Sequence, residues 1–212
     1  RLGLASGAYL KDGRVTCVLG GKETDICAVT DIPIKGDHNI ENVLASSLAG
    51  CLAGAGSINR TIKRFKGLSH RVEPVGTVDG VEYIDDSKGT TVDSTLRALE
   101  SSAKPVILIA GGKDKNSDYR VVREAVKDKV KHLILIGEAR TRIREALGDL
   151  VDTREAETMA DAVALAHSLA KSGFEVLLSP MCSSFDMYRD YKHRGDAFKE
   201  AVRSLKDRQK IS

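Results

Sequence analysis

Side chains able to bind an anionic ligand are concentrated in three short segments of the sequence. The first, DDSKGTT (85–91), combines two carboxylates with hydroxyls and a lysine, and it follows an apolar run at 80–84. The second, GGKDKNSD (111–118), and the third, SPMCSSFD (179–186), also follow apolar runs. Lysines beside hydroxyls suit a ligand that carries carboxylate and phosphate groups.

Each segment also has a purely structural interpretation. Asp86 and Ser87 could form a helix-capping turn, and the serines at 183–184 could form a simple turn. The glycine pair at 111–112 could only allow close packing, because no G-x-G-x-x-G surrounds it. His70 could be an ordinary buried histidine near a turn. The occurrence of three such segments after three strands favours a binding site.

From about residue 68, apolar strand-like runs alternate with amphipathic helix-like runs. The strand-like runs are PVILIAGG (105–112), HLILIGE (132–138) and FEVLLSP (174–180). The helix-like runs cover residues 118–130, 139–147, 158–173 and 191–206, with Thr158 as a cap and Gly173 as a stop. This alternation predicts an α/β fold with a Rossmann-like, mostly parallel sheet covered by helices on both faces. Ligands bind such sheets at the carboxyl ends of the strands, where the three polar segments would meet.

The first 67 residues have a different character. Residues 8–19 predict a β-hairpin that turns at Asp12-Gly13. Two helices are expected next, the first from about residue 37 to the glycines at 54 and 56, and the second from Ser57 as cap. Another hairpin, with its turn at 79–80, begins the alternating part of the chain, so we expect a domain boundary near residue 67.

Composition excludes several classes of protein. The net charge of +3 is spread along the chain, so we expect neither a nucleic-acid nor a membrane partner. The four cysteines form no C-x-x-C pair, which argues against zinc and a disulfide framework and for a cytoplasmic protein. No apolar run approaches the ~20 residues of a membrane span, and no signal peptide is recognisable. The sequence also lacks the G-x-x-x-x-G-K-[ST] phosphate loop.

Five motifs occur in an order that resembles a known family. They are GDHNIENVLASSLA, FKGLSHRVE, IDDSKGTT, ILIAGGKDK and LLSPMCSSFDMYRDYKHRGDAF. Together they resemble the Mur ligases of peptidoglycan synthesis over residues 37–205. The pairing of G-G-x-D-K with S-P-x-C-x-S-x-D is similar to the members that add D-glutamate.

The resemblance implies a three-domain enzyme of which this chain is the C-terminal part. Residues 1–67 would be the tail of the central ATP-binding domain. Residues 68–212 would be the C-terminal Rossmann-like domain, which binds the incoming amino acid. The missing N-terminal and central domains would then be partners of this chain, and their absence would explain the missing phosphate loop. A sequence that begins with Arg1 agrees with this expectation.

The resemblance also implies the reaction and its ligands. The substrates would be ATP, UDP-N-acetylmuramoyl-L-alanine and D-glutamate, with Mg²⁺ as the metal, and the product an amide formed through an acyl phosphate. We expect no turnover by the chain alone. Neither a catalytic residue nor a metal ligand is assigned here, because the carbamylated lysine that helps to bind metal in this family should lie upstream.

Residue by residue, the resemblance assigns two sets of contacts. Asn39 and Asn42 would bind the adenine of ATP, Arg71 a phosphate and Asp86 the ribose. Six residues would bind the carboxylates of D-glutamate or enclose its side chain: Lys88, Thr90, Lys115, Ser184, Phe185 and Tyr191. One departure is Asp85, where the family commonly has asparagine.

Two alternatives remain open from the sequence. The parent could be a related ligase that adds another amino acid, such as a folylpolyglutamate synthase. The chain could also be a Rossmann-like module that binds a ligand without turnover. An upstream phosphate-loop motif would favour a ligase.

Overall fold

The computed structural model describes residues 6–34 and 36–209, and the chain divides into two compact units, Arg1–Gly67 and Leu68–Ser212. The first unit has one hydrophobic core, and the second has two, one on each side of its sheet. The assignment of the units to particular domains of a larger ligase stays a prediction.

The first unit packs two helices on a small antiparallel sheet. Its elements are β1 (Ser6–Lys11), β2 (Arg14–Leu19), β3 (Lys22–Ala28), the 3₁₀ turn η1 (Val29–Asp31), α1 (Asp37–Leu52) and α2 (Ile58–Arg64). The turn at Asp12-Gly13 has φ of 52° and 72°, as a two-residue hairpin requires. Ser57 precedes α2, but its side chain makes no capping bond. Its carbonyl oxygen accepts from the Thr61 N–H instead, so the expected side-chain cap was wrong.

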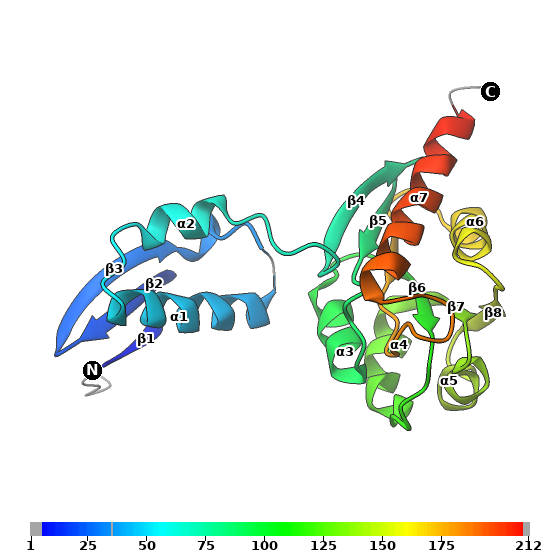
Figure 1. Cartoon of the computed structure of the whole chain (residues 1–212), viewed down its shortest axis with the longest axis horizontal. Helices are drawn as coiled ribbons and strands as arrows, with labels where there is room; N and C mark the ends of the chain where they lie inside the picture. Colours follow the sequence, from blue (N-terminus) through cyan, green and yellow to red (C-terminus); the bar gives the residue numbers. More distant parts are fainter. Residues whose placement is uncertain (1–5, 35, 210–212) are drawn as a thin grey trace. The chain divides into compact units, whose positions relative to one another are not determined.

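The second unit is built on a six-stranded, mostly parallel sheet, as the alternating pattern predicted (Figure 1). The strand order is β4-β5-β9-β6-β7-β8, and only the β4–β5 hairpin is antiparallel. The strands are β4 (Glu73–Val78), β5 (Val81–Asp85), β6 (Val106–Gly111), β7 (Val130–Ile136), β8 (Asp152–Glu155) and β9 (Glu175–Leu178). Because β9 lies between β5 and β6, the three polar segments follow three neighbouring strands.

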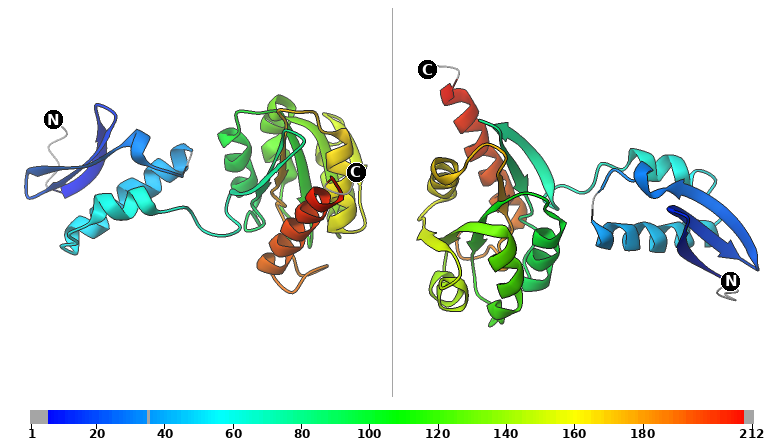
Figure 2. Two further views of the ribbon diagram at one scale, coloured as in Figure 1. Left: turned by 90° about the horizontal axis from the view of Figure 1, so that it is seen from above. Right: turned by 180° about the vertical axis from the view of Figure 1, so that it is seen from behind.

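Helices cover both faces of this sheet, which confirms the predicted layers (Figures 1 and 2). On one face lie α3 (Val92–Ser101), η2 (Tyr119–Val122), α4 (Arg123–Lys129) and α5 (Arg140–Leu147). On the other lie α6 (Met159–Leu169) and α7 (Tyr191–Gln209). Among the described residues, no helix has the length and apolar character needed to cross a bilayer.

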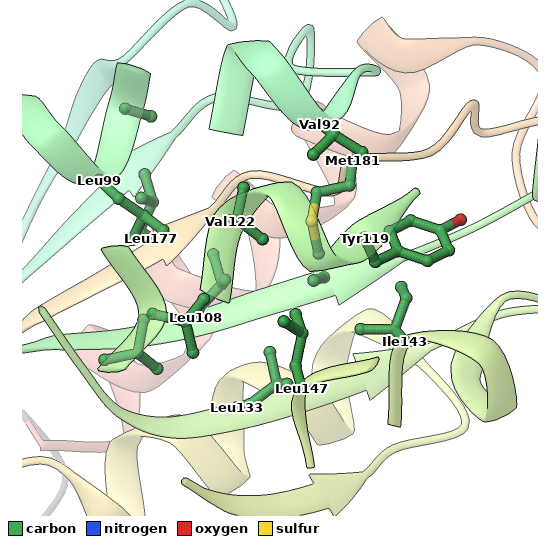
Figure 3. Close-up of a cluster of buried hydrophobic side chains, with 14 of the residues drawn as sticks. Val92, Leu99, Leu108, Tyr119, Val122, Leu133, Ile143, Leu147, Leu177 and Met181 are labelled. Carbon is green, nitrogen blue, oxygen red and sulfur yellow. The ribbon is translucent and has the colours of Figure 1, made fainter. Parts of the chain in front are cut away.

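The alternation of side chains along the central strands explains why two cores form. Leu108 of β6 and Leu133 of β7 pack with α3, α4 and α5, as Figure 3 shows. Their neighbours Ile107 and Ile134 pack with α6 and α7. Successive side chains of a strand point to opposite faces, so a strand buried on both faces must be apolar throughout.

In the second unit, three details differ from the sequence-based expectations. The helix expected over 118–130 begins as the 3₁₀ turn η2 and becomes α-helical only at Arg123. Helix α6 ends at Leu169, before the expected stop at Gly173, although Thr158 caps its start by accepting from the Asp161 N–H. Strand β8 was not expected, because its sequence, DTRE, is polar.

Candidate functional site

The candidate site lies in the second unit, where loops follow β5, β9 and β6. We call residues 86–91 the first loop, residues 112–118 the second loop and residues 179–190 the third loop. Backbone hydrogen bonds hold them together. The Met181 N–H donates to the Gly89 carbonyl over 3.0 Å, and the Lys113 N–H donates to the Ser183 carbonyl over 2.9 Å. The three polar segments therefore form one connected surface, as the sequence predicted.

The glycine pair allows the second loop to approach its neighbours. Gly111 and Gly112 have φ of 120° and 133°, values that L-residues avoid. A Cβ on Gly112 would collide with the Ser183 carbonyl oxygen, and one on Gly111 with that of Ile136. The expectation was that the pair lets strand and helix pack closely; the structure shows instead a close approach to the end of β7 and to the third loop.

From the first turn of α7, Arg194 joins the first loop to the third loop and reaches the Gly111 carbonyl at the end of β6. It is 1% exposed, and its guanidinium donates to the Ser87 hydroxyl (3.0 Å) and carbonyl (2.9 Å). It also donates to the carbonyls of Cys182 (3.1 Å) and Ser183 (3.2 Å). Asp190, just before the helix, accepts from the His193 N–H and so fixes the helix start.

The charge of Arg194 has no direct counter-ion. Within residues 6–34 and 36–209 its guanidinium forms no ion pair with a carboxylate. Burial lowers its pKa to about 10, so it remains protonated at neutral pH. A buried cation that is bonded mainly to carbonyls adds positive potential to the surrounding loops, which favours an anionic ligand.

Lys88 and Tyr191 meet at the edge of the site. The Lys88 ammonium lies 4.6 Å from the centroid of the Tyr191 ring and donates to its hydroxyl over 3.3 Å. Lys88 has no carboxylate partner among the described residues, so its charge is available to a ligand. The structure thus brings together two of the six residues expected to bind D-glutamate.

The other four residues of that set have varied surroundings. Thr90 is half-buried in the first loop, and Ser184 is 2% exposed in the third loop. Phe185 is 68% exposed in the third loop. Lys115 is exposed in the second loop and makes no ion pair within the described residues. Their proposed contacts with D-glutamate stay predictions.

The second loop is held by Asp114, next to Lys115. Its carboxylate accepts from the Tyr119 hydroxyl over 2.8 Å and pairs with Arg142 of α5. Burial alone would raise the pKa of Asp114, but these two donors outweigh it and lower the pKa. Asp114 therefore remains ionised and holds the loop against its neighbours.

Asp86, the expected ribose ligand, is 5% exposed. Its carboxylate accepts from the Ser179 hydroxyl over 2.7 Å and from the Val72 N–H over 3.3 Å. Burial raises its pKa to about 6, although these donors favour the ionised form. Its contact with ribose stays a prediction.

Arg71, the expected phosphate ligand, is exposed and follows the buried His70. The His70 Nδ1 lies 2.7 Å from Asp85 Oδ2, and the Lys199 ammonium lies 2.6 Å from Glu73 Oε2 and 3.7 Å from Asp85 Oδ2. His70 is therefore a buried histidine, as the structural interpretation expected. It also belongs to a charged network with Asp85, Glu73 and Lys199.

The same network contains the one group of potential metal ligands found in the described part of the chain. One ligand atom from each of His70, Glu73 and Asp85 lies within 4.8 Å of the others. The Lys199 ammonium already contacts both carboxylates, so a cation is part of the protein here. The group therefore does not fit Mg²⁺.

Asn39 and Asn42, expected to bind adenine, lie one turn apart on α1 of the first unit. The Asn42 side chain donates to Asn39 Oδ1 over 3.4 Å. Asn42 also lines a pocket of about 210 Å³. The other lining residues are five apolar ones and two with hydroxyls: Ile32, Ile34, Val43, Ile62, Phe65, Ser46 and Thr61.

Comparison with known proteins identifies the family. Residues 70–182, more than half of the chain, match the family model described as "Mur ligase, glutamate ligase domain". The chain belongs to the Mur ligase family. It is 48% identical over 204 residues to the UDP-N-acetylmuramoylalanine–D-glutamate ligase of Geotalea daltonii, which covers 95% of this chain and 45% of that relative. The chain therefore spans about half the length of the curated relatives that it matches.

Solved structures of Mur ligases and related enzymes have the same fold. MurF from Acinetobacter baumannii superposes with a TM-score of 0.64 at 15% identity, over 94% of this chain and 46% of that protein. FolC from E. coli, solved in complex with ADP, superposes with a TM-score of 0.63 at 15% identity, over 98% of this chain and 48% of that protein. At identities this low, the superpositions are evidence for a shared fold but not for a shared function.

Sequence reasoning missed Arg194, which has the most connections in the site. A signal was present, because Arg194, Phe198 and Val202 recur every four residues along the helix pattern and share one face. A lone arginine on an otherwise apolar face indicates a buried, hydrogen-bonded guanidinium. The roles of Glu73 and Lys199 were also missed.

Proposed function

We propose that this chain is the C-terminal part of an ATP-dependent ligase. The enzyme would join D-glutamate to UDP-N-acetylmuramoyl-L-alanine in cytoplasmic peptidoglycan synthesis. The observation that carries the proposal is the site at the carboxyl ends of β5, β9 and β6, in which Lys88 and Arg194 have no carboxylate partner among the residues that the structure describes. The names of the relatives, which are D-glutamate ligases, support this choice of amino acid.

The first unit would supply part of the nucleotide site. The apolar pocket beside Asn42 suits a flat adenine ring, and Asn39 would add a further hydrogen bond. Arg71 would bind a phosphate and Asp86 the ribose. In this proposal residues 1–67 are the tail of the central ATP-binding domain, and residues 68–212 form the domain that binds the amino acid.

In the second unit, the loops would orient a dianionic amino acid. Lys88 and Lys115 would neutralise its carboxylates, while the hydroxyls of Thr90 and Ser184 would donate hydrogen bonds. The exposed aromatic Phe185 and the ring of Tyr191 would enclose its aliphatic carbons. Bound in this way, the amine of D-glutamate would be held in one orientation, which lowers the entropic barrier to attack.

The reaction would proceed through an acyl phosphate. Transfer of the terminal phosphate of ATP to the carboxylate of UDP-N-acetylmuramoyl-L-alanine would activate that carboxylate. The amine would attack the acyl carbon, and phosphate would leave from the tetrahedral intermediate. Mg²⁺, bound by residues outside this chain, would neutralise phosphate charge.

The proposal is tested by phosphate release from the full-length parent with ATP, Mg²⁺ and UDP-N-acetylmuramoyl-L-alanine. We expect release that depends on D-glutamate and falls at least about 100-fold in Lys88→Ala and Lys115→Ala. Lys131→Ala is the matched control, because Lys131 is exposed at the amino-terminal end of β7. Release with another amino acid only would refute the proposed substrate. No release with any amino acid would favour a binding module.

A further inference from the structure

Arg71 lies between two residues with unfavourable backbone conformations. His70 has φ of 64° and Val72 has φ of 44°. Side chains with a Cβ rarely adopt positive φ, and a β-branched residue such as valine is a clear outlier there. Such strain persists only where surrounding contacts impose it, and it is concentrated at functional sites.

Two hydrogen bonds with the first loop, one to its backbone and one to a side chain, hold this strained segment, residues 70–72. The His70 carbonyl accepts from the Lys88 N–H over 3.0 Å. The Val72 N–H donates to Asp86 Oδ1 over 3.3 Å. The segment that carries Arg71 is therefore fixed against the loop that carries Asp86 and Lys88.

Two carboxylates, that of Glu73 and that of the fully buried Asp85, complete the support. Glu73 Oε2 accepts from the His70 N–H over 2.7 Å, and Asp85 Oδ2 lies 2.7 Å from the His70 ring nitrogen Nδ1. His70 is thus held through its backbone by one carboxylate and through its side chain by the other. On the other side of the ring, the Asp196 carboxylate oxygen Oδ1 lies 3.9 Å from His70 Nε2.

Lys199 is the cation that both carboxylates share. Its side chain is 14% exposed and reaches from α7 to within 2.6 Å of Glu73 and 3.7 Å of Asp85. Without its charge, Glu73 and Asp85 would be close like charges in a largely buried setting, which is unfavourable. Glu73, about a third exposed, would be free to turn towards solvent and release the His70 N–H.

We propose that Lys199 and Glu73 are positioning residues for the nucleotide phosphate, because they keep the strained segment in the conformation that presents Arg71. This inference rests on the proposed function and extends it to two residues that would touch no ligand. Arg71 suits the role, since it is exposed and forms no ion pair within residues 6–34 and 36–209.

The test is steady-state kinetics of the full-length parent carrying Lys199→Met or Glu73→Gln, both close in size to the native residues. We expect KM for ATP to rise about tenfold while KM for D-glutamate changes less than about twofold. Lys199→Arg, which retains the charge, should recover most of the loss. The matched control is Lys104→Met, which breaks an equally short 2.6 Å pair with Glu82 at the other end of the strands.

Each result decides between positioning and a general effect on the fold. Equal increases in both KM values, or an unchanged KM for ATP in Lys199→Met, would overturn the proposal. A rise in KM for ATP in Lys104→Met as large as that in Lys199→Met would also overturn it.

Calorimetric titration with ADP provides a readout independent of turnover. Weaker ADP binding is expected in Lys199→Met but not in Lys104→Met, with thermal melting confirming that both variants are folded. A parent that releases no phosphate with D-glutamate would overturn the proposed function, and the ADP titration would then still decide the positioning role.

Discussion

Replacing Asp86 with asparagine should stabilise the second unit at neutral pH. Asp86 is 5% exposed, and burial raises its pKa from an ordinary 3.8 to about 6. Below pH 3.8 the group is protonated in both the folded and the unfolded state, so it has no differential effect. Between about pH 4 and 6 the folded state retains the proton longer, and stability falls as the pH rises.

The size of the effect follows from the difference between the two pKa values. About two pH units, at 1.36 kcal/mol each, correspond to about 3 kcal/mol of lost stability above pH 6. An asparagine removes this cost but rearranges the hydrogen bond to Ser179, a loss of about 1 kcal/mol. Asp86→Asn should therefore gain about 2 kcal/mol at pH 8 and lose about 0.5 kcal/mol at pH 4, where the cost of ionisation is only about 0.5 kcal/mol.

Urea denaturation of the chain at pH 4 to 8 measures this directly. Near-ultraviolet circular dichroism is a suitable probe, because the chain has no tryptophan and four of its five tyrosines lie in the second unit. Asp118→Asn is the control, since Asp118 is exposed and Arg120 lowers its pKa. The reasoning fails if Asp86→Asn gains nothing at pH 8, or if its gain is the same at pH 4.

Three further substitutions test other parts of the site. Arg194→Met should lower the free energy of unfolding, measured by urea denaturation, by about 3 kcal/mol, because several buried carbonyls lose their donor. Arg194→Lys should not restore this stability, and equal stability of the native protein and both variants would refute the prediction. Tyr191→Phe keeps the ring beside Lys88 and should change KM for D-glutamate less than about threefold, whereas Tyr191→Leu should raise it about tenfold; similar values for both would exclude a role of the ring. Gly112→Ala should cost about 3 kcal/mol or more, since its Cβ meets a backbone carbonyl and its φ is 133°, whereas Gly13→Ala, with open space and a φ of 72° near the left-handed helical region, should cost about 1 kcal/mol. Thermal melting compares the two glycines, and equal losses would contradict the collision.

Much of the fold could be predicted, because its strands are marked by strong local signals. The apolar run of β6 and the turn at Asp79-Gly80 are readable from the sequence alone. Strand β8 is not, since a polar edge strand with one neighbour shows no apolar pattern. The position of β9 between β5 and β6 is also unreadable, because it depends on pairing between segments about 90 residues apart in the sequence.

The candidate site was predictable at the level of loops but not of contacts. Lys88 and Tyr191 came from the resemblance, and the structure brings them together. The helix pattern could mark Arg194 as buried but not name Ser87, Cys182 and Ser183 as its partners. Lys199 is largely enclosed because α7 packs beside β4 and β5, which no local pattern specifies. The deep burial of Asp86 likewise comes from Ser179, which lies far along the chain.

The strand order has a consequence for the emergence of this protein from the ribosome. Strands β5 and β6 do not pair with each other, and the strand that joins them, β9, is synthesised after the five other strands of the sheet. Until it arrives, the nascent chain exposes strand edges on both sides of the gap, which chaperones or neighbouring chains can bind. Since α7 follows β9, the three loops of the candidate site and the arginine that joins two of them come together only after both β9 and α7 have been synthesised.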